Sequence, residues 1–257
     1  MRFENHIEYN EHNEILMPVL EIFLSCNGEG LDVGKPVTFV RLVGCNLRCC
    51  FGKCGHCDTP ESLLFPTQYR KNGLVKCFNY MTAKEVADKI KEHGTKRVTL
   101  TGGNPLSRGG IGKWIHDLME ELGDGVLLEL EENGSIDINI HLLRYLNEEE
   151  RKRLRITLDY KTISSKMNHF MLLRNWDFLN EDDVIKCVVG NREDMEDVVA
   201  KIKERKPKAQ IIFSPVFNEI ELKEIWEFAC EPDIIPLDIK VQVQLHKIAY
   251  PWDMRGV

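Results

Sequence analysis

Short runs of apolar and β-branched residues alternate with amphipathic helical patterns along most of this chain. A helical spacing of apolar positions recurs in residues 83–90 and 195–202, and Thr82 with Glu85 forms a capping box before the first of them. Strands and helices that alternate in this way favour parallel pairing through right-handed crossovers. We therefore expect an α/β fold, built as an open sheet or as a complete or partial barrel. The strands are predicted at residues 19–24, 37–43, 97–100, 126–130, 154–158, 184–189, 211–213 and 239–245.

The length and charge of the chain limit its organisation and its partners. A chain of 257 residues fits one domain that spans residues 1–257, because α/β barrels of this size fold around a single core. There is no run of about eighteen apolar residues and no basic-then-apolar leader, so we expect a cytoplasmic protein without a membrane partner. A net charge of −7 argues against direct binding to the phosphate backbone of a nucleic acid.

Five of the nine cysteines lie between positions 45 and 57, directly after a predicted strand. Thiolates this close together can hold one soft metal centre, which is either zinc or an iron–sulfur cluster. Four ligands would complete a structural zinc site, whereas three would leave one iron open to another molecule. The cysteines alone leave both alternatives open.

Two further segments with polar and glycine residues follow neighbouring strands. Thr101-Gly102-Gly103-Asn104-Pro105 comes after the strand at 97–100, and residues 131–134 come after the next one. The loops that leave the carboxyl ends of parallel strands converge on one face, where ligands bind. We expect these segments and the cysteine loop to share that face.

Several motifs resemble one enzyme family, and they occur in the family's order. They are Asn-Gly-Glu-Gly at 27–30, residues 39–42, Gly-Cys-Asn-Leu at 44–47, Cys-Asp-Thr at 57–59, residues 101–105 and 130–131, Lys161, residues 164–167, Gln-Leu-His-Lys at 244–247, and Arg-Gly-Val at 255–257. Together they resemble the 7-carboxy-7-deazaguanine synthases, which are radical S-adenosylmethionine enzymes of queuosine and archaeosine biosynthesis. The resemblance covers nearly the whole chain.

The resemblance implies a partial, open β/α barrel of the radical SAM type with a mostly parallel sheet. It implies a carbon–nitrogen lyase that converts 6-carboxy-5,6,7,8-tetrahydropterin to 7-carboxy-7-deazaguanine with loss of ammonia, in a pathway that leads to tRNA modification. The implied cofactors are a [4Fe-4S] cluster, S-adenosylmethionine and Mg²⁺. The implied partners are the pterin, an external electron donor such as flavodoxin or ferredoxin, and a second subunit of a homodimer.

The cluster ligands implied by the resemblance are Cys45, Cys54 and Cys57. This set keeps the cysteines of the Gly-Cys-Asn and Cys-Asp-Thr motifs, with eight residues in the first gap. Cys50, Cys54 and Cys57 instead reproduce the family's usual spacing. We prefer Cys45 because it keeps its place directly after the strand, and Cys49 and Cys50 are the alternatives for that position.

The other site residues implied by the resemblance divide between the cofactors and the substrate. Thr59 matches a ligand of Mg²⁺, which prefers oxygen donors. S-adenosylmethionine is assigned His56, Cys57, Asp58, Gly102, Gly103, Asn104, Asp159, Tyr160 and Lys161. The pterin is assigned Cys26, Asn27, Gly28, Glu29, Arg41, Thr101, Glu131, Gln244, His246 and the terminal carboxylate of Val257.

Two segments depart from the family pattern. Asn104 stands where many relatives carry Glu, although its amide oxygen can still accept a hydrogen bond from an aminium group. Asp159 and Tyr160 stand where relatives carry Ser and Pro, so contacts there are expected from the backbone.

Two expectations about the pterin residues rest on the properties of the side chains as well. Arg41 lies on an otherwise apolar strand, where a buried guanidinium needs an anionic partner, so we expect it to bind the carboxylate of the pterin. Gln244 and His246 are expected on one face of the strand at 239–245.

Two other functions remain as alternatives. One is a radical enzyme of another kind, such as an activase that installs a glycyl radical on a partner protein. The other is a zinc-stabilised binding module, which the alternation of strands and helices over the whole chain disfavours.

Overall fold

A computed structural model describes residues 3–50, 57, 59–72 and 77–250 of the chain, without the side chains of residues 70–72. In this part of the chain a ten-stranded sheet has the order β1-β2-β3-β5-β6-β7-β8-β9-β10, and β4 pairs with β2. The strands are β1 Glu8–Tyr9, β2 Ile15–Cys26, β3 Pro36–Leu42, β4 Asn79–Met81, β5 Arg97–Gly102, β6 Leu127–Glu132, β7 Leu154–Tyr160, β8 Val184–Val189, β9 Gln210–Pro215 and β10 Lys240–Val241. The helices are α1 Pro66–Asn72, α2 Ala83–His93, α3 Ile111–Leu122, α4 Ile138–His141, α5 Glu148–Lys152, α6 Arg192–Arg205, α7 Leu222–Ala229 and α8 His246–Ala249.

The sheet is mostly parallel and open, which confirms the predicted α/β fold. Neighbours from β3 to β10 along this order pair in parallel, whereas β2 is antiparallel to β1, β3 and β4. Within the described residues no pairing joins β1 to β10, so the sheet does not close. The prediction of a strand over 239–245 is wrong beyond Val241, because β10 ends there.

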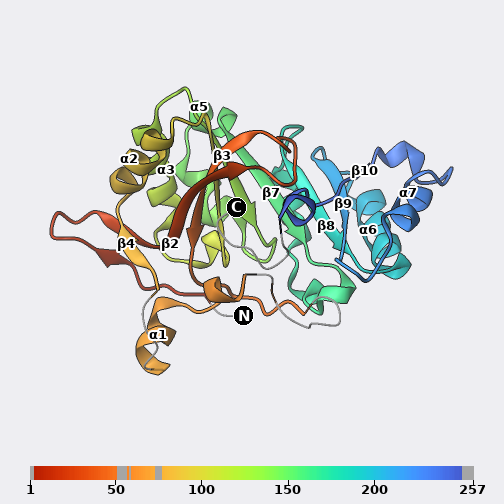
Figure 1. Cartoon of the computed structure of the whole chain (residues 1–257), viewed down its shortest axis with the longest axis horizontal. Helices are drawn as coiled ribbons and strands as arrows, with labels where there is room; N and C mark the ends of the chain where they lie inside the picture. Colours follow the sequence, from red (N-terminus) through yellow and green to blue (C-terminus); the bar gives the residue numbers. More distant parts are fainter. Residues whose placement is uncertain (1–2, 51–56, 58, 73–76, 251–257) are drawn as a thin grey trace.

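One face of the sheet is apolar and carries the helices. Val40, Leu42, Val98, Leu100 and Leu130 are all at most 1% exposed in the core on this side. Figure 1 shows α2 and α3 beside β2 and β3, and α6 and α7 beside β8 and β9. Both predicted helices form, and α2 begins with the predicted capping box between Thr82 and Glu85. No helix in the described ranges is both long and apolar enough to cross a membrane.

The opposite face of the sheet is polar, and we call it the polar face. Parallel strands that are covered on both faces are usually apolar throughout, so a row of polar side chains on one face indicates a binding site. The register aligns these side chains across the strands, because Arg41 is paired with Thr101 and Asp159 with Lys186. The polar face comprises Arg41, Thr99, Thr101, Glu129, Glu131, Arg155, Thr157, Asp159 and Lys186.

Candidate active site

The glycine loop after β5 packs directly against the chain that leads to Cys45. The φ angle of Gly102 is 128°, and a Cβ atom added there would lie 2.1 Å from the carbonyl oxygen of Leu42. A Cβ atom on Gly103 would lie 2.5 Å from backbone atoms of Gly44 and Ser62. Only glycine permits this approach of two backbones. The structure therefore brings together the cysteine segment and the glycine loop, as the sequence predicts.

The side chain of Asn104 lies in a buried hydrogen-bond network beneath this loop. Its Nδ2 donates to Oδ1 of Asn46 at 3.2 Å and to Oε1 of Glu132 at 2.9 Å, and its Oδ1 accepts from the backbone N–H of Asn133 at 3.0 Å. Burial raises the pKa of Glu132 to about 8. Asn104 therefore ties the cysteine loop to the end of β6, and its amide oxygen already has a donor.

Two of the described cysteines of the loop, Cys45 and Cys57, accept backbone hydrogen bonds at their sulfur atoms. The Sγ of Cys45 accepts from the N–H of Leu47 at 3.4 Å, and the Sγ of Cys57 accepts from the N–H of Thr59 at 3.4 Å. Amide donors of this kind stabilise a sulfur that carries negative charge. Burial raises the pKa of the Cys45 thiol, and the charge of Cys49 adds to this effect, whereas Lys161 and Arg48 oppose it.

Four predicted site residues, Cys54, His56, Asp58 and Val257, lie outside the described residues. The choice among Cys45, Cys49 and Cys50 as the third cluster ligand therefore stays a prediction. Among these, Cys45 is buried and lies just past β3, while Cys49 and Cys50 are half-buried.

Asp159 and Lys161 form a charged group at the carboxyl end of β7. The Nζ of Lys161 lies 2.5 Å from Oδ2 of Asp159, and the Nζ of Lys186 lies 3.5 Å from Oδ1. Burial works against ionisation of Asp159, but the two lysines outweigh it, so that the pKa of Asp159 is lowered. Its Oδ1 is buried and accepts no hydrogen bond within the described structure.

The side chain of Tyr160 points away from this group, into the core on the helix side. Its hydroxyl donates to Oδ2 of Asp197 at 2.7 Å, and its ring meets Trp176 edge-on at a centroid distance of 5.7 Å. Only the backbone of Tyr160 is therefore available to a ligand at the polar face.

The loop between β2 and β3 reaches the polar face from the opposite end of the sheet. Because β2 is antiparallel to β3, this loop starts at the amino ends of the parallel strands (Figure 1). Asn27 donates to Oε2 of Glu129 at 3.0 Å, and Oε1 of Glu29 lies 3.1 Å from the Nζ of Lys186. Cys26, the last residue of β2, is exposed. The predicted pterin residues 27–29 thus enter from one end of the face and the cysteine loop from the other.

Gln244 and His246 meet the same loop, although the prediction that they alternate on one strand is wrong. Gln244 follows β10, and His246 is the first residue of α8. The N–H of Gln242 still donates to the carbonyl of Phe213 on β9 at 2.9 Å. Beyond it the chain bonds to the β2–β3 loop instead, where the N–H of Leu245 donates to the carbonyl of Gly28 at 2.9 Å. Gln244 lies 3.3 Å from Oε1 of Glu29. A Cβ atom on Gly28 would lie 2.3 Å from Nδ1 of His246.

Arg41, Thr101 and Glu131 lie side by side on β3, β5 and β6. The hydroxyl of Thr101 donates to Oε2 of Glu131 at 2.5 Å. Arg41 has the anionic partner that its burial requires, because its Nε donates to Oε1 of Glu21 at 2.7 Å. Thr101 and Glu131 lie inside their strands, which extend two residues further than predicted.

Sequence reasoning missed several residues that build this face. Lys186 lies between Glu29 and Asp159 and is 7% exposed. Burial raises the pKa of Glu129 to about 7. The side chain of Gln242 holds the loop by accepting from the N–H of Gly30 at 2.6 Å and donating to its carbonyl at 3.0 Å. The signal in the sequence was the placement of polar residues between apolar ones in strands that are otherwise buried.

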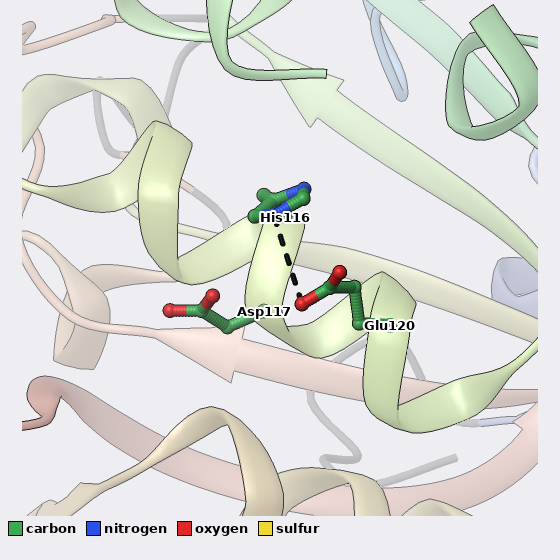
Figure 2. A group of neighbouring side chains, drawn as sticks. All are labelled: His116, Asp117 and Glu120. Atoms are coloured by element: carbon green, nitrogen blue, oxygen red, sulfur yellow. Dashed lines mark ion pairs between the residues drawn. The ribbon is translucent and has the colours of Figure 1, made fainter. Parts of the chain in front are cut away.

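A different group of side chains with metal-binding potential lies on α3, away from the polar face. It consists of His116, Asp117 and Glu120, and Figure 2 shows Nε2 of His116 paired with the carboxylate of Glu120, at 3.6 Å. Asp117 is also paired with Lys113 one turn earlier. Nitrogen and oxygen donors do not match the thiolates that hold an iron–sulfur cluster, so this group is not the predicted cluster site.

Comparisons with known proteins identify relatives over nearly the whole chain. No family model matches it. The 7-carboxy-7-deazaguanine synthase of Clostridium acetobutylicum is 37% identical over 242 residues, which are 93% of this chain and 98% of that protein. The enzyme of the same name from Leptospira interrogans is 30% identical over 254 residues, or 93% and 97% of the two chains. The crystal structure of QueE from Escherichia coli matches with a TM-score of 0.64 at 21% identity, covering 90% of this chain and 95% of that one, so the two share a fold.

Proposed function

The chain belongs to the 7-carboxy-7-deazaguanine synthase family, and we infer from this premise how its polar face serves the reaction. The protein is a radical S-adenosylmethionine lyase of 7-deazapurine biosynthesis. It converts 6-carboxy-5,6,7,8-tetrahydropterin to 7-carboxy-7-deazaguanine with loss of ammonia. The observation that carries the assignment of residues is the polar face itself, because it joins the cysteine loop at one end to the β2–β3 loop at the other.

The residues at the end of β3 fit an iron–sulfur cluster. The sulfur atoms of Cys45 and Cys57 accept amide hydrogen bonds, and with Cys54 these residues would hold the cluster by three ligands. When bound, the cluster and S-adenosylmethionine supply a 5′-deoxyadenosyl radical. The family resemblance further supports Mg²⁺ at Thr59, with His56 and Asp58 beside the cofactor.

The glycine loop and Asp159 suit the cofactor. Gly102 and Gly103 allow this loop to pack against the backbone of the cysteine segment, which places the loop beside the cluster ligands, where the cofactor would bind. Oδ1 of Asp159 is buried and lies 3.5 Å from the Nζ of Lys186, without a well-formed hydrogen bond in the described structure, and a hydroxyl group of the adenosyl moiety would supply one. Lys161 keeps Asp159 ionised. The side chain of Asn104 braces the loop, so we assign any contact of this residue with the cofactor to its backbone.

The β2–β3 loop and the neighbouring strands suit the pterin. Arg41 carries charge for the carboxylate, and Glu131 and Thr101 offer acceptors for the amino-pyrimidine edge. Residues 26–29 supply the wall opposite these strands. Gln244 and His246 lie against that wall, and the terminal carboxylate of Val257 would reach the amino group of the pterin.

The remaining assignments rest on the family resemblance. We propose a cytoplasmic homodimer of a single domain that takes electrons from a flavodoxin or ferredoxin and feeds queuosine or archaeosine synthesis.

Anaerobic turnover tests the proposed function. Reconstituted protein is incubated with S-adenosylmethionine, Mg²⁺, a reductant and the carboxytetrahydropterin, and the products are identified by mass. We expect 7-carboxy-7-deazaguanine together with 5′-deoxyadenosine. If 5′-deoxyadenosine forms without the deazaguanine, the substrate is wrong. If neither forms although the cluster is intact and reducible, the assignment as a radical enzyme is wrong.

A further inference from the structure

We propose that Glu21 is a positioning residue that fixes the guanidinium of Arg41 for the carboxylate of the pterin. The inference rests on the proposed function, because it takes the pterin carboxylate as the ligand of Arg41. Glu21 lies on β2, directly opposite Arg41 on β3. Neither the cysteine motif nor the family motifs drew attention to it.

A β-bulge places Glu21 at this position. Val19 pairs with Leu42 and Glu21 pairs with Arg41, so that β2 contains one extra residue, Leu20, between the two pairs. A bulge of this kind changes the face to which the following side chains point. Without it, the alternation set by Val19 would leave Glu21 out of register with Arg41, and the arginine would lose its carboxylate partner.

The contact holds Arg41 by one edge of its guanidinium and leaves the other edge available. Nε donates to Oε1 of Glu21 at 2.7 Å, and this is the ion pair that Arg41 makes in the described structure. Both Nη atoms are without a hydrogen-bond partner there. They form the fork that binds a carboxylate through two parallel hydrogen bonds. The Arg41 and Glu21 side chains are 18% and 30% exposed. The pair is therefore mostly buried from solvent but can still be reached by a ligand.

The stacked rings of Phe23 and Phe39 also support the guanidinium of Arg41. The Cζ of Arg41 lies 5.6 Å from the centre of the Phe23 ring, and Phe23 stacks on Phe39 at 5.1 Å with an interplanar angle of 17°. A cation over an aromatic ring is attracted by it, and the two rings restrict where the guanidinium can lie. Glu21 and Phe23 together thus fix the orientation of Arg41 before the pterin arrives, which lowers the entropy lost on binding.

Binding of two non-reacting pterins tests the proposal. With the cluster oxidised and S-adenosylmethionine present, the fluorescence of 6-carboxypterin and of pterin without the carboxylate is titrated with wild-type protein and with Glu21→Gln. We expect Glu21→Gln to weaken binding of 6-carboxypterin about ten-fold, since a single charge-assisted contact orients the fork, and to leave pterin unchanged. The matched control is Glu231→Gln, which removes the carboxylate from the exposed pair between Glu231, just after α7, and Arg192 on α6, and should change neither affinity.

Any other result with folded Glu21→Gln overturns the proposal. Equal weakening of both pterins would mean that Glu21 only supports the fold, and tighter binding of 6-carboxypterin would mean that Glu21 competes with the ligand. If Glu21→Gln does not fold, Phe23→Leu replaces it, and the same selective loss is expected to a smaller extent. If wild-type protein binds both pterins equally while it still forms 7-carboxy-7-deazaguanine, the proposal fails and the proposed function stands.

Discussion

Replacement of Lys186 by methionine should destabilise the protein, because it leaves two acidic groups on the polar face without their shared counterion. The Nζ of Lys186 lies 3.1 Å from Oε1 of Glu29 and 3.5 Å from Oδ1 of Asp159. Lys186 is 7% exposed, and methionine preserves most of the packing of its side-chain stem. The stability lost in Lys186→Met therefore reflects the missing charge.

The size of the loss in the free energy of unfolding depends on which partners Asp159 and Glu29 keep without Lys186. Removal of one partner from a buried ion pair costs about 3–5 kcal/mol, because the remaining charge stays buried. Asp159 keeps Lys161, and Glu29 keeps the amide of Gln244. We therefore expect the lower end, a loss of about 3 kcal/mol in the free energy of unfolding near pH 8.

The loss should depend on pH in a defined direction. The pKa of Asp159 is lowered in the folded protein, in part by Lys186, so this carboxylate contributes stability above its unfolded pKa. That contribution is lost as the pH falls through the folded pKa. The lysine itself has a raised pKa and stays charged throughout this range. The difference between wild type and Lys186→Met should therefore be largest near pH 8 and shrink as the pH falls below about 4.

Urea unfolding followed by circular dichroism, under anaerobic conditions on reconstituted protein, measures this difference. Lys84→Met is the matched control, because it removes a lysine from an exposed pair with Asp88 on α2 and should leave the unfolding midpoint unchanged. A loss below about 1 kcal/mol at pH 8, or a loss that grows in acid, would show that Lys186 does not neutralise these carboxylates.

Two further substitutions test the loops at the end of β3 and β5. Gly102→Ala should lower the free energy of unfolding by about 2–5 kcal/mol in urea titrations, because the residue has a φ of 128° and its new methyl group would meet the carbonyl of Leu42. An unchanged free energy of unfolding would mean that the two backbones do not approach so closely. Cys45→Ala should lose the [4Fe-4S] absorbance and most of the iron after anaerobic reconstitution, whereas Cys50→Ala should keep both; the reverse pattern would assign the third cluster ligand to Cys50.

The sequence by itself determined the class of fold and the order of its elements. Apolar runs and helical spacings are local patterns, so they predicted β2, β3, the strands from β5 to β9 and the capped start of α2 without any knowledge of tertiary contacts. The short strand β4 was missed. The motifs were likewise enough to identify the family. The order of the strands also correctly predicted that the glycine loop would lie near the cysteine segment, since the two follow neighbouring parallel strands.

Only the tertiary structure decided how the site is held together. The pairing of Arg41 with Glu21 depends on a bulge in β2, and the position of Lys186 between Glu29 and Asp159 depends on where the β2–β3 loop folds back. Gln244 and His246 were predicted on a strand because polar and apolar residues alternate there, but at Leu245 the backbone bonds to Gly28 instead of to β9. These contacts join residues far apart in the chain, and local spacing carries no information about them because register and loop closure are set by the whole sheet.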